Sequence, residues 1–248
     1  MLGLIVKMPA AATVELAGHA GFDMVLVDTE HGPSDMAELE HHIRAADSAG
    51  IPVLVRVSHA ESPDILRALD AGAHGIVVPH VTSQEDVHRA AALTRYPPDG
   101  RRSLALSTRA GRHSTRSVRE HLDAASREVA LIAQLEDAQA LENVAEILDA
   151  DGLAGVFIGP SDLSASLGWP GQTYHPVVSD AVERIVEAAV GRPALALCTL
   201  AADENEARAW IERGARIVLL NAPSIMAARL RAIADRVHEA SEVEARAS

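Results

Sequence analysis

Charged and polar residues follow directly after several short apolar runs in this sequence. They are Asp28-Thr29-Glu30-His31, Arg56, Pro79-His80, Gln134-Leu135-Glu136, Gly159-Pro160-Ser161-Asp162, Cys198-Thr199 and Asn221. A charged group at the end of a buried strand is costly unless it is paired or bound to a ligand. Their repeated placement after apolar runs therefore indicates a functional site.

Glu136 and Asp162 are the candidate metal ligands, because they follow neighbouring apolar runs and their side chains can converge on one ion. Two carboxylates, completed by waters and substrate oxygens, suit Mg²⁺ or Mn²⁺ and leave coordination positions open for chemistry. The alternative is that each carboxylate caps a helix or pairs with a loop arginine.

Arg56 would project beside such an ion, where its guanidinium could bind a substrate carboxylate through two parallel hydrogen bonds. The alternative is a salt bridge from Arg56 to Asp28 or Glu30. Asp28 and His31 could form an acid–base dyad in which the carboxylate orients the imidazole. The alternative for His31 is a solvated loop side chain.

Composition excludes several other classes of function. The chain of 248 residues has 35 acidic and 22 basic residues and a net charge of −13, so a basic face for nucleic acid is not expected. The single cysteine, Cys198, excludes an internal disulfide or a multi-cysteine metal site. A Schiff-base mechanism would depend on Lys7, the sole lysine. Nucleotide-binding glycine motifs and zinc-protease spacing are absent, so no organic cofactor is expected.

The apolar runs are short and alternate with amphipathic stretches. The runs cover residues 3–6, 24–27, 53–57, 75–78, 129–133, 155–158, 194–197 and 217–220. Helical periodicity covers residues 10–20, 35–49, 62–71, 83–94, 138–148, 177–190, 203–213 and 224–239. Ser34, Ser62, Ser83 and Ser224 are the predicted N-caps, and Gly50, Gly72 and Gly214 the predicted helix stops.

Eight strand–helix units in this length favour a single closed (β/α)8 barrel over an open, doubly wound sheet. We expect the barrel over residues 1–240 and a polar tail over 241–248. Residues 96–126, rich in Arg and Ser, are expected as a long loop at the barrel mouth. No targeting segment or apolar run long enough to span a membrane is visible, so a cytoplasmic location is expected.

Six segments resemble the HpcH/HpaI family of class II, metal-dependent 2-keto-acid aldolases. They are GFDMVLVDTEHGP, PVLVRV, ILRALDAGAHGIVVPHV, RYPPDGRRS, AQLEDAQALENVAEI and GVFIGPSDLSASLG, in the family's order. The family includes 4-hydroxy-2-oxoheptanedioate aldolases and 2-keto-3-deoxy-sugar-acid aldolases. The resemblance runs from about residue 3 to about residue 230, and it implies a (β/α)8 barrel assembled as a hexamer, a trimer of dimers, with the last helix packed on a partner.

The resemblance also implies roles for individual residues. Glu136 and Asp162 would bind Mg²⁺ or Mn²⁺, with Co²⁺ as a further option. Arg56 would contact the carboxylate and keto oxygen of pyruvate. The same pocket would include Gln134, the Gly159-Pro160 turn, and the backbone N–H groups of Ser161 and Asp162, which would hold that carboxylate. His31, oriented by Asp28, would act as acid–base residue through a metal-bound water. Asp70 would lie near a neighbouring subunit's site.

The implied reaction is reversible cleavage of a 4-hydroxy-2-keto acid to pyruvate and an aldehyde through a metal-stabilised enolate. Arg109 and Arg112 could bind an anionic aldehyde, or could lie in a solvated loop. An alternative activity of the same residues is oxaloacetate decarboxylation, or citrate-forming or CoA-lyase-like chemistry. A barrel kept only for binding is a third possibility, but it predicts missing ligands, and the candidate ligands are all present.

Four features depart from the family's pattern. The chain begins at its first strand, where relatives have an earlier helix. His80 stands where the family often has Met, and Asn221-Ala222 replaces an acidic residue. Residues 109–117 are more basic than usual. These departures leave metal and pyruvate binding intact and put the identity of the aldehyde in doubt.

Overall fold

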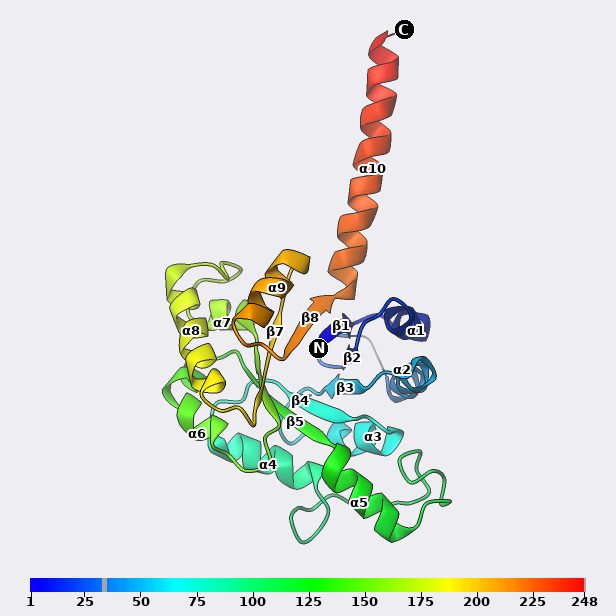
Figure 1. Ribbon diagram of the computed structural model, residues 1–248, viewed down its shortest axis with the longest axis vertical. Helices are drawn as coiled ribbons and strands as arrows, with labels where there is room; N and C mark the ends of the chain where they lie inside the picture. Colours follow the sequence, from blue (N-terminus) through cyan, green and yellow to red (C-terminus); the bar gives the residue numbers. More distant parts are fainter. Residues whose placement is uncertain (33–34, 248) are drawn as a thin grey trace.

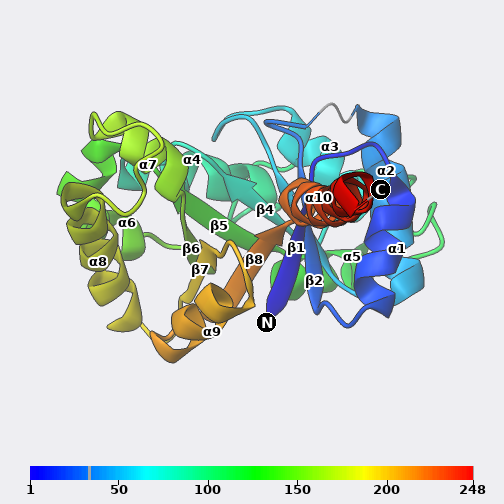
Figure 2. The same cartoon turned by 90° about the horizontal axis from the view of Figure 1, so that it is seen from above.

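Eight parallel strands close into a barrel in the order β1 to β8 in the computed structural model of this protein. The structure describes residues 1–32 and 35–247, with the side chains of 240–247 left aside. Each strand pairs with its neighbours in sequence, and β8 pairs back onto β1 through Leu2↔Val218 to Ile5↔Asn221. Helices surround the strands (Figures 1 and 2). The predicted (β/α)8 barrel is confirmed.

The elements alternate along the chain as expected. The strands are β1 (Leu2–Val6), β2 (Met24–Asp28), β3 (Val53–Arg56), β4 (Gly75–Val78), β5 (Ala130–Leu135), β6 (Gly155–Ile158), β7 (Ala196–Leu200) and β8 (Ile217–Asn221). The helices are α1 (Ala11–His19), α2 (Met36–Ala49), α3 (Asp64–Ala71), α4 (Gln84–Thr94), α5 (Val118–Glu128), η1 (Ala138–Glu142), α6 (Val144–Leu148), α7 (Pro160–Ser166), α8 (Pro176–Val190), α9 (Glu204–Glu212) and α10 (Ala222–Ala247).

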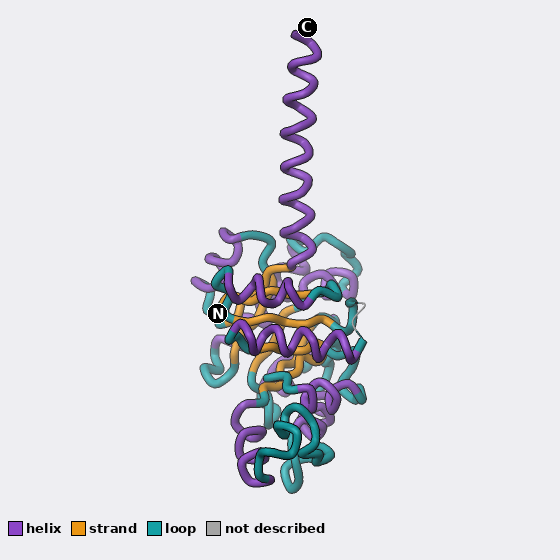
Figure 3. The backbone as a smooth tube through the Cα atoms, turned by 90° about the vertical axis from the view of Figure 1, so that its right-hand side faces the viewer, coloured by secondary structure: helices purple, strands orange, loops and turns teal. Residues whose placement is uncertain are grey.

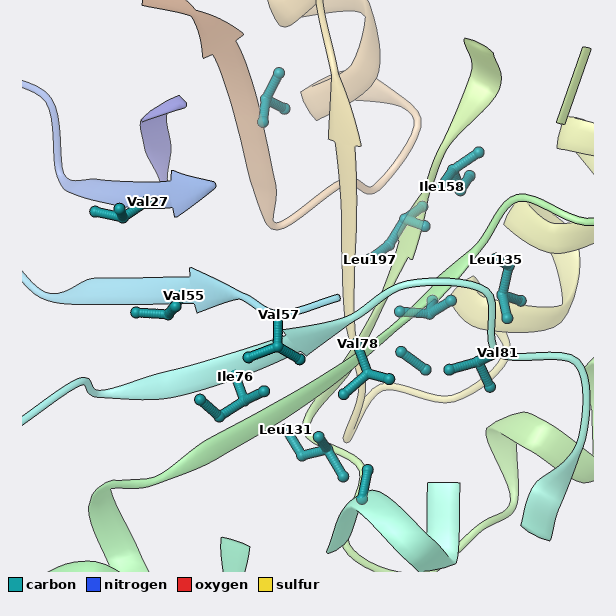
Figure 4. Close-up of a cluster of buried hydrophobic side chains, with 14 of the residues drawn as sticks. Val27, Val55, Val57, Ile76, Val78, Val81, Leu131, Leu135, Ile158 and Leu197 are labelled. Carbon is teal, nitrogen blue, oxygen red and sulfur yellow. The ribbon is translucent and has the colours of Figure 1, made fainter. Parts of the chain in front are cut away.

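Each strand has two buried faces. Side chains that point outward pack against the helices in one large apolar cluster, and Figure 4 labels ten of them along β2 to β7 and just beyond β3 and β4. Side chains that point inward fill the barrel: Ile5, Met24, Leu26, Leu54, Val77, Ile132, Phe157, Cys198 and Leu219. Because both faces are covered, the strands read as continuous apolar runs rather than alternating ones.

This register decides which residues enter the barrel mouth. Successive side chains of a strand alternate between its faces, so the position two residues after an inward apolar side chain also points inward. Along β1 to β3 that position holds Lys7, Asp28 and Arg56, and on β5 it holds Gln134. The polar residues therefore form a layer directly above the apolar interior, at the carboxyl ends of the strands.

The predicted helix starts hold in part. Ser83 caps α4 in a capping box with Asp86. Ser62 does not cap α3, which begins after Pro63, although its hydroxyl accepts a hydrogen bond from the N–H of Asp64 at 3.2 Å. Ser224 lies inside α10 rather than before it, because that helix follows β8 directly. Ser34 lies outside the described residues, and Asp35 caps α2.

Two of the predicted helix stops have the backbone that glycine favours. Gly50 and Gly72 end α2 and α3 in the left-handed region, with φ of 72° and 101°. Gly214, with φ of 98°, follows the C-cap Arg213 of α9. A side chain at such a φ is strained, which is why glycine marks these ends in the sequence.

Residues 95–117 do not lie at the mouth, which corrects the expectation for the Arg- and Ser-rich segment. They connect the end of α4 at Thr94 to the start of α5 at Val118, and α5 then leads into β5. Helices of a (β/α)8 barrel run back to the amino ends of the strands, so this connection lies at the end opposite the mouth. The sequence missed this because α5 has only two buried side chains, His121 and Ala124, and shows a weak apolar pattern.

The last helix, α10, projects from the barrel along the long axis of the molecule (Figures 1 and 3). Its exposed apolar side chains include Met226, Leu230, Ile233 and Val237, which are 44–63% exposed. The helix continues to Ala247, and the boundary expected between barrel and tail at residue 240 stays a prediction. Within the described residues, no helix is long and apolar enough to cross a membrane.

Candidate active site

A buried ion pair between β2 and β3 forms the floor of the mouth. Asp28 is fully buried and pairs in register with Arg56 across the two strands. Its carboxylate accepts hydrogen bonds from Nε of Arg56 at 3.0 Å and from Nη2 at 2.5 Å. Nζ of Lys7, from the end of β1, lies 3.1 Å from the same carboxylate.

These partners determine the charge of both residues. Burial alone would raise the pKa of Asp28, but the hydrogen bonds and charge of Arg56, the N–H of His31 and the charge of Lys7 together hold that pKa below its usual value. Burial likewise acts to lower the pKa of Arg56, and the bonds and charge of Asp28 outweigh it. The pair is therefore fully ionised at neutral pH.

Arg56 also reaches beyond Asp28. Its Nη1 donates to Oε1 of Gln134 at 3.2 Å, and its Nε lies 3.3 Å from Oε2 of Glu30. The salt bridges weighed as alternatives for Arg56 are thus present, and they hold its guanidinium at the edge of the mouth. Oε2 of Glu30 is buried without a hydrogen-bond partner among the described residues.

Glu136 is a buried carboxylate with few cationic neighbours. It is 1% exposed, and its Oε1 accepts the backbone N–H of His80 at 3.0 Å while its Oε2 accepts from Nε2 of Gln134. Burial raises its pKa to about 7, which the His80 and Gln134 contacts oppose and the charge of nearby Asp162 reinforces. A buried carboxylate that repels a second carboxylate is stabilised by a cation bound between them.

Gly159 leaves the space that these groups occupy. A Cβ at this position would lie 2.6 Å from Oε2 of Glu136 and 3.0 Å from Nε2 of Gln134. Asp162 follows in the first turn of α7, whose first N–H groups have no partner within the helix. The N–H groups of Ser161 and Asp162 belong to this first turn, and their binding of a substrate carboxylate stays a prediction.

Asp28 does not orient His31 through its imidazole, so this part of the predicted dyad does not hold. The Asp28 carboxylate accepts the backbone N–H of His31 at 3.2 Å, since Arg56 and Lys7 occupy its remaining positions. The imidazole is half exposed and its Nε2 lies 3.7 Å from Oε2 of Glu30. Its role as acid–base residue stays a prediction.

His80 extends the mouth on the β4 side. Its Nδ1 lies 2.9 Å from Oδ2 of Asp137, and its Nε2 lies 3.6 Å from Oε1 of Glu30. Burial acts to lower the pKa of His80, but the carboxylates of Asp137, Glu136 and Glu30 raise it above its usual value. The cationic form of His80 is therefore favoured, and its Nδ1 lies 3.6 Å from Oε1 of the candidate ligand Glu136.

Two predicted residues lie elsewhere in this chain. Asp70 accepts a hydrogen bond from Nη2 of Arg102 at 2.9 Å. Arg109 donates to the carbonyl of Ala71 at 3.0 Å and to Asp47. These contacts are at the amino ends of the strands, so neither residue reaches the mouth of its own barrel.

The sequence analysis gave Asp137 no role, considered Lys7 only for a Schiff base, and named Glu30 only as a possible salt-bridge partner of Arg56. Lys7 had a detectable signal, because it stands two residues after the inward Ile5, as Asp28 does after Leu26. Glu30 and Asp137 lie just beyond their strands, where the strand register no longer determines direction. Their contacts with Arg56 and His80 depend on loop geometry.

Comparison with known proteins points to one family. Residues 2–224 match the sequence profile described as HpcH/HpaI aldolase/citrate lyase. A hydroxypyruvate/pyruvate aldolase of Paraburkholderia phytofirmans is 35% identical over 228 residues, which are 90% of this chain and 86% of that protein. A 5-keto-4-deoxy-D-glucarate aldolase of Salmonella paratyphi A is 35% identical over 219 residues, 88% of this chain and 84% of the relative.

A solved structure is similar over almost the whole fold. The crystal structure of an HpcH/HpaI aldolase/citrate lyase family protein from Burkholderia cenocepacia has a TM-score of 0.89 and 33% sequence identity, and the match covers 96% of this chain and 94% of that one.

Proposed function

Because the chain belongs to the HpcH/HpaI aldolase/citrate lyase family, we propose that it cleaves a 4-hydroxy-2-keto acid reversibly to pyruvate and an aldehyde with the help of a divalent metal ion. The relatives are keto-acid aldolases, and an aldolase is a carbon–carbon lyase. The observation that carries the proposal is the pair of carboxylates, Glu136 and Asp162, beside Arg56 and Gln134 in the mouth.

The residues of the mouth fit a small divalent ion. Glu136 is buried, its pKa is raised to about 7, and the charge of Asp162 adds to that rise. Oxygen ligands of this kind suit Mg²⁺ or Mn²⁺. When bound, such an ion would act as a Lewis acid toward the keto oxygen of the substrate. Among the described residues no group of three or more His, Cys, Asp or Glu is arranged to bind a metal, and in this proposal waters and substrate oxygens complete the coordination.

The protein's own residues would bind and orient pyruvate. Arg56, fixed by Asp28 on one side, presents Nη1 toward Gln134 and can contact the keto acid there. The N–H groups of Ser161 and Asp162 at the start of α7 can bind its carboxylate. Positive charge fixed before the reaction stabilises the enolate's developing negative charge without reorganisation.

Proton transfer is assigned to the loop after β2. His31 is half exposed next to Glu30, so it can reach the alkoxide oxygen of the 4-hydroxy group when the substrate lies in the mouth. In cleavage, removal of the 4-hydroxyl proton accompanies breakage of the C3–C4 bond to give the aldehyde and the pyruvate enolate, and return of a proton to C3 gives pyruvate. Condensation is the reverse. Lys7 stays paired with Asp28, so in this proposal it positions Asp28 rather than forming an imine.

Exchange of the pyruvate methyl protons tests the proposal before the aldehyde is known. The full chain is incubated with pyruvate in D₂O and Mg²⁺ or Mn²⁺, and the methyl signal is followed by NMR. We expect metal-dependent loss of the signal that EDTA abolishes and that Glu136→Gln slows at least about a hundredfold. Glu146→Gln, an exposed carboxylate on α6, is the matched control and should exchange normally. Equal exchange in Glu136→Gln and wild type would reject the assignment.

A second candidate follows from the citrate lyase members that the family profile includes. The same enolate chemistry could serve oxaloacetate decarboxylation or the formation and cleavage of citrate-like acids. A panel of aldehydes, oxaloacetate and acetyl-CoA separates the two, because an aldolase requires an aldehyde acceptor and a decarboxylase releases CO₂ without one.

We also propose that the chain works as a homo-oligomer, with a hexamer as the family's expected form. The apolar side chains of Met226, Leu230, Ile233 and Val237 follow one another at spacings of three and four along α10, so they lie on one face of the helix. An exposed apolar stripe of this kind usually marks a protein–protein contact.

A further inference from the structure

A second cavity lies at the amino ends of β4 and β5, at the end of the barrel opposite the mouth. Its volume is about 470 Å³. Its walls come from the turn before β4, which includes Gly72 and His74, from α5, which contributes His121, and from the connection between α4 and α5. That connection provides four arginines: Arg102, Arg109, Arg112 and Arg116.

Arg102 is buried with an unused hydrogen-bond donor. Its side chain is 2% exposed, its Nη2 donates to Asp70 at 2.9 Å, and its guanidinium lies 4.7 Å from the centre of the Tyr96 ring. Its Nε has no hydrogen-bond partner among the residues that the structure describes. A buried charged donor without an acceptor is costly, so its position on this cavity indicates an acceptor from outside the chain.

Arg109 is fixed in place beside it. Its Nη1 donates to the carbonyl of Ala71 at 3.0 Å, and its Nη2 to Asp47. Gly72 makes room for the guanidinium, because a Cβ there would lie 2.6 Å from Nη1. The arginine is therefore held against the end of α3.

Arg112 and Arg116 are held less closely, although both lie near enough to Glu120 for their charge to lower its pKa. Neither has a carboxylate within 4 Å among the described residues, and Arg116 makes only a 3.5 Å contact with the carbonyl of Ala110. The backbone N–H groups of 112–114 are already used within the loop, by the carbonyls of Arg109, Thr108 and Leu106 at 2.7–3.0 Å. The side chains are thus the groups left to bind a ligand.

The charge of the cavity is opposite to that of the whole chain. Four arginines face two lining acids, Asp47 and Glu128, with Asp70 paired to Arg102. Burial and the charge of Arg102 lower the pKa of His121, which favours its neutral form. A net positive cavity in a chain of net charge −13 selects an anionic ligand.

We propose that this cavity binds one oxyanion group of a small ligand, a phosphoryl or a carboxylate group, through Arg112, Arg116 and the free Nε of Arg102. Guanidinium groups pair with both kinds of oxyanion in the same two-bond geometry. The cavity lies at the end of this barrel opposite its own mouth, and the test below measures binding rather than aldolase activity.

Anion binding to the full chain in EDTA tests the proposal without using activity. Inorganic phosphate and, separately, malonate are titrated at constant ionic strength, and the shift in Tm and the heat of binding are measured against NaCl. We expect a saturable rise in Tm with at least one of the two anions and none with NaCl. A response to phosphate alone identifies a phosphoryl ligand, and one to malonate alone a carboxylate ligand.

Variants locate the binding. The double variant Arg112→Gln/Arg116→Gln should weaken anion binding at least about tenfold, since two charge-assisted hydrogen bonds are lost. Arg119→Gln is the matched control, because Arg119 is 93% exposed and does not line the cavity. Circular dichroism checks that each variant is folded. If the double variant is unstable, Arg112→Lys, which keeps the positive charge, is measured in its place. Unchanged binding in the folded double variant, equal loss in Arg119→Gln, or an equal effect of NaCl would overturn the proposal.

Discussion

Glu136 combines burial with a pKa of about 7, and this makes the protein's stability depend on pH. A raised pKa means that the folded chain favours the protonated acid. Without metal, the group therefore destabilises the fold as pH rises from its ordinary value of 4.5 toward 7. We expect metal-free Glu136→Gln to be more stable than wild type at pH 8, by on the order of 2 kcal/mol, and equally stable near pH 4. Urea unfolding at the two pH values measures this, and a stability gain that is the same at both would contradict it.

The same pKa predicts how metal affinity changes. A metal ion requires the ionised carboxylate, so protons compete with it below pH 7. We expect the apparent affinity for Mn²⁺ to fall about tenfold per pH unit between pH 6 and pH 5, and to level off above pH 8. Isothermal titration calorimetry measures the affinity directly. A flat profile across pH 5–8 would show that Glu136 is not a ligand.

Asp28 joins Lys7, Arg56 and two backbone N–H groups, so neutralising it leaves Lys7 without this partner and Arg56 with only the longer contact to Glu30. We expect Asp28→Asn to reduce the free energy of unfolding by roughly 3 kcal/mol, because Arg56 is 6% exposed and loses the closer of its two carboxylate partners. Asp151→Asn, at an exposed turn, should change it by less than about 0.5 kcal/mol. Chemical denaturation compares the two variants, and equal stabilities would refute the role of the ion pair.

At this scale the sequence predicted the residue types of the site better than their contacts. Arg56 and Gln134 are placed by strand register, which can be counted from the apolar runs, and Glu136 directly follows the last residue of β5. The contact that Asp28 makes with His31 could not be predicted from the register. Four donor groups compete for the Asp28 carboxylate, and which of them bind it depends on distances across three strands.

The turn from β6 into α7 carries a prediction at the scale of an element. Gly159 lies where a Cβ would meet both Glu136 and Gln134. We expect Gly159→Ala to displace these side chains and to weaken Mn²⁺ binding at least about tenfold while the barrel stays folded. Gly191→Ala is the control, because its nearest neighbour would be 3.6 Å away and its φ is −64°. Equal Mn²⁺ affinities in the two variants would show that Gly159 has no part in the site.

Helix ends show which local signals the sequence carries reliably. The prediction of Ser83 as the N-cap of α4 was correct, because its capping box needs only Asp86, three residues later. The prediction of Ser224 as an N-cap was wrong, because β8 passes into α10 without a loop. The helix begins at Ala222, two residues before Ser224. The position of residues 95–117 was also missed, since a long connection can lie at either end of a barrel and α5 has few buried apolar residues.

The exposed stripe on α10 predicts assembly at the scale of the whole molecule. Leu230 and Ile233 are 63% and 44% exposed on a helix that projects from the barrel (Figure 3). We expect Leu230→Glu/Ile233→Glu to lower the mass of the particle measured by light scattering, because charges replace the apolar contact. Arg231→Gln, also exposed on α10, should leave the mass unchanged. A wild-type chain that is already monomeric at all concentrations would reject the proposed oligomer.

The length of α10 has a consequence for dilute solutions. Its 26 residues extend about 39 Å, and the distal turns have no barrel surface beneath them (Figure 1). Helices without tertiary packing are marginal in water, so these turns draw their stability from association and follow mass action. The far-ultraviolet circular dichroism of the protein should therefore decrease on dilution, as subunits separate and the end of the helix unwinds.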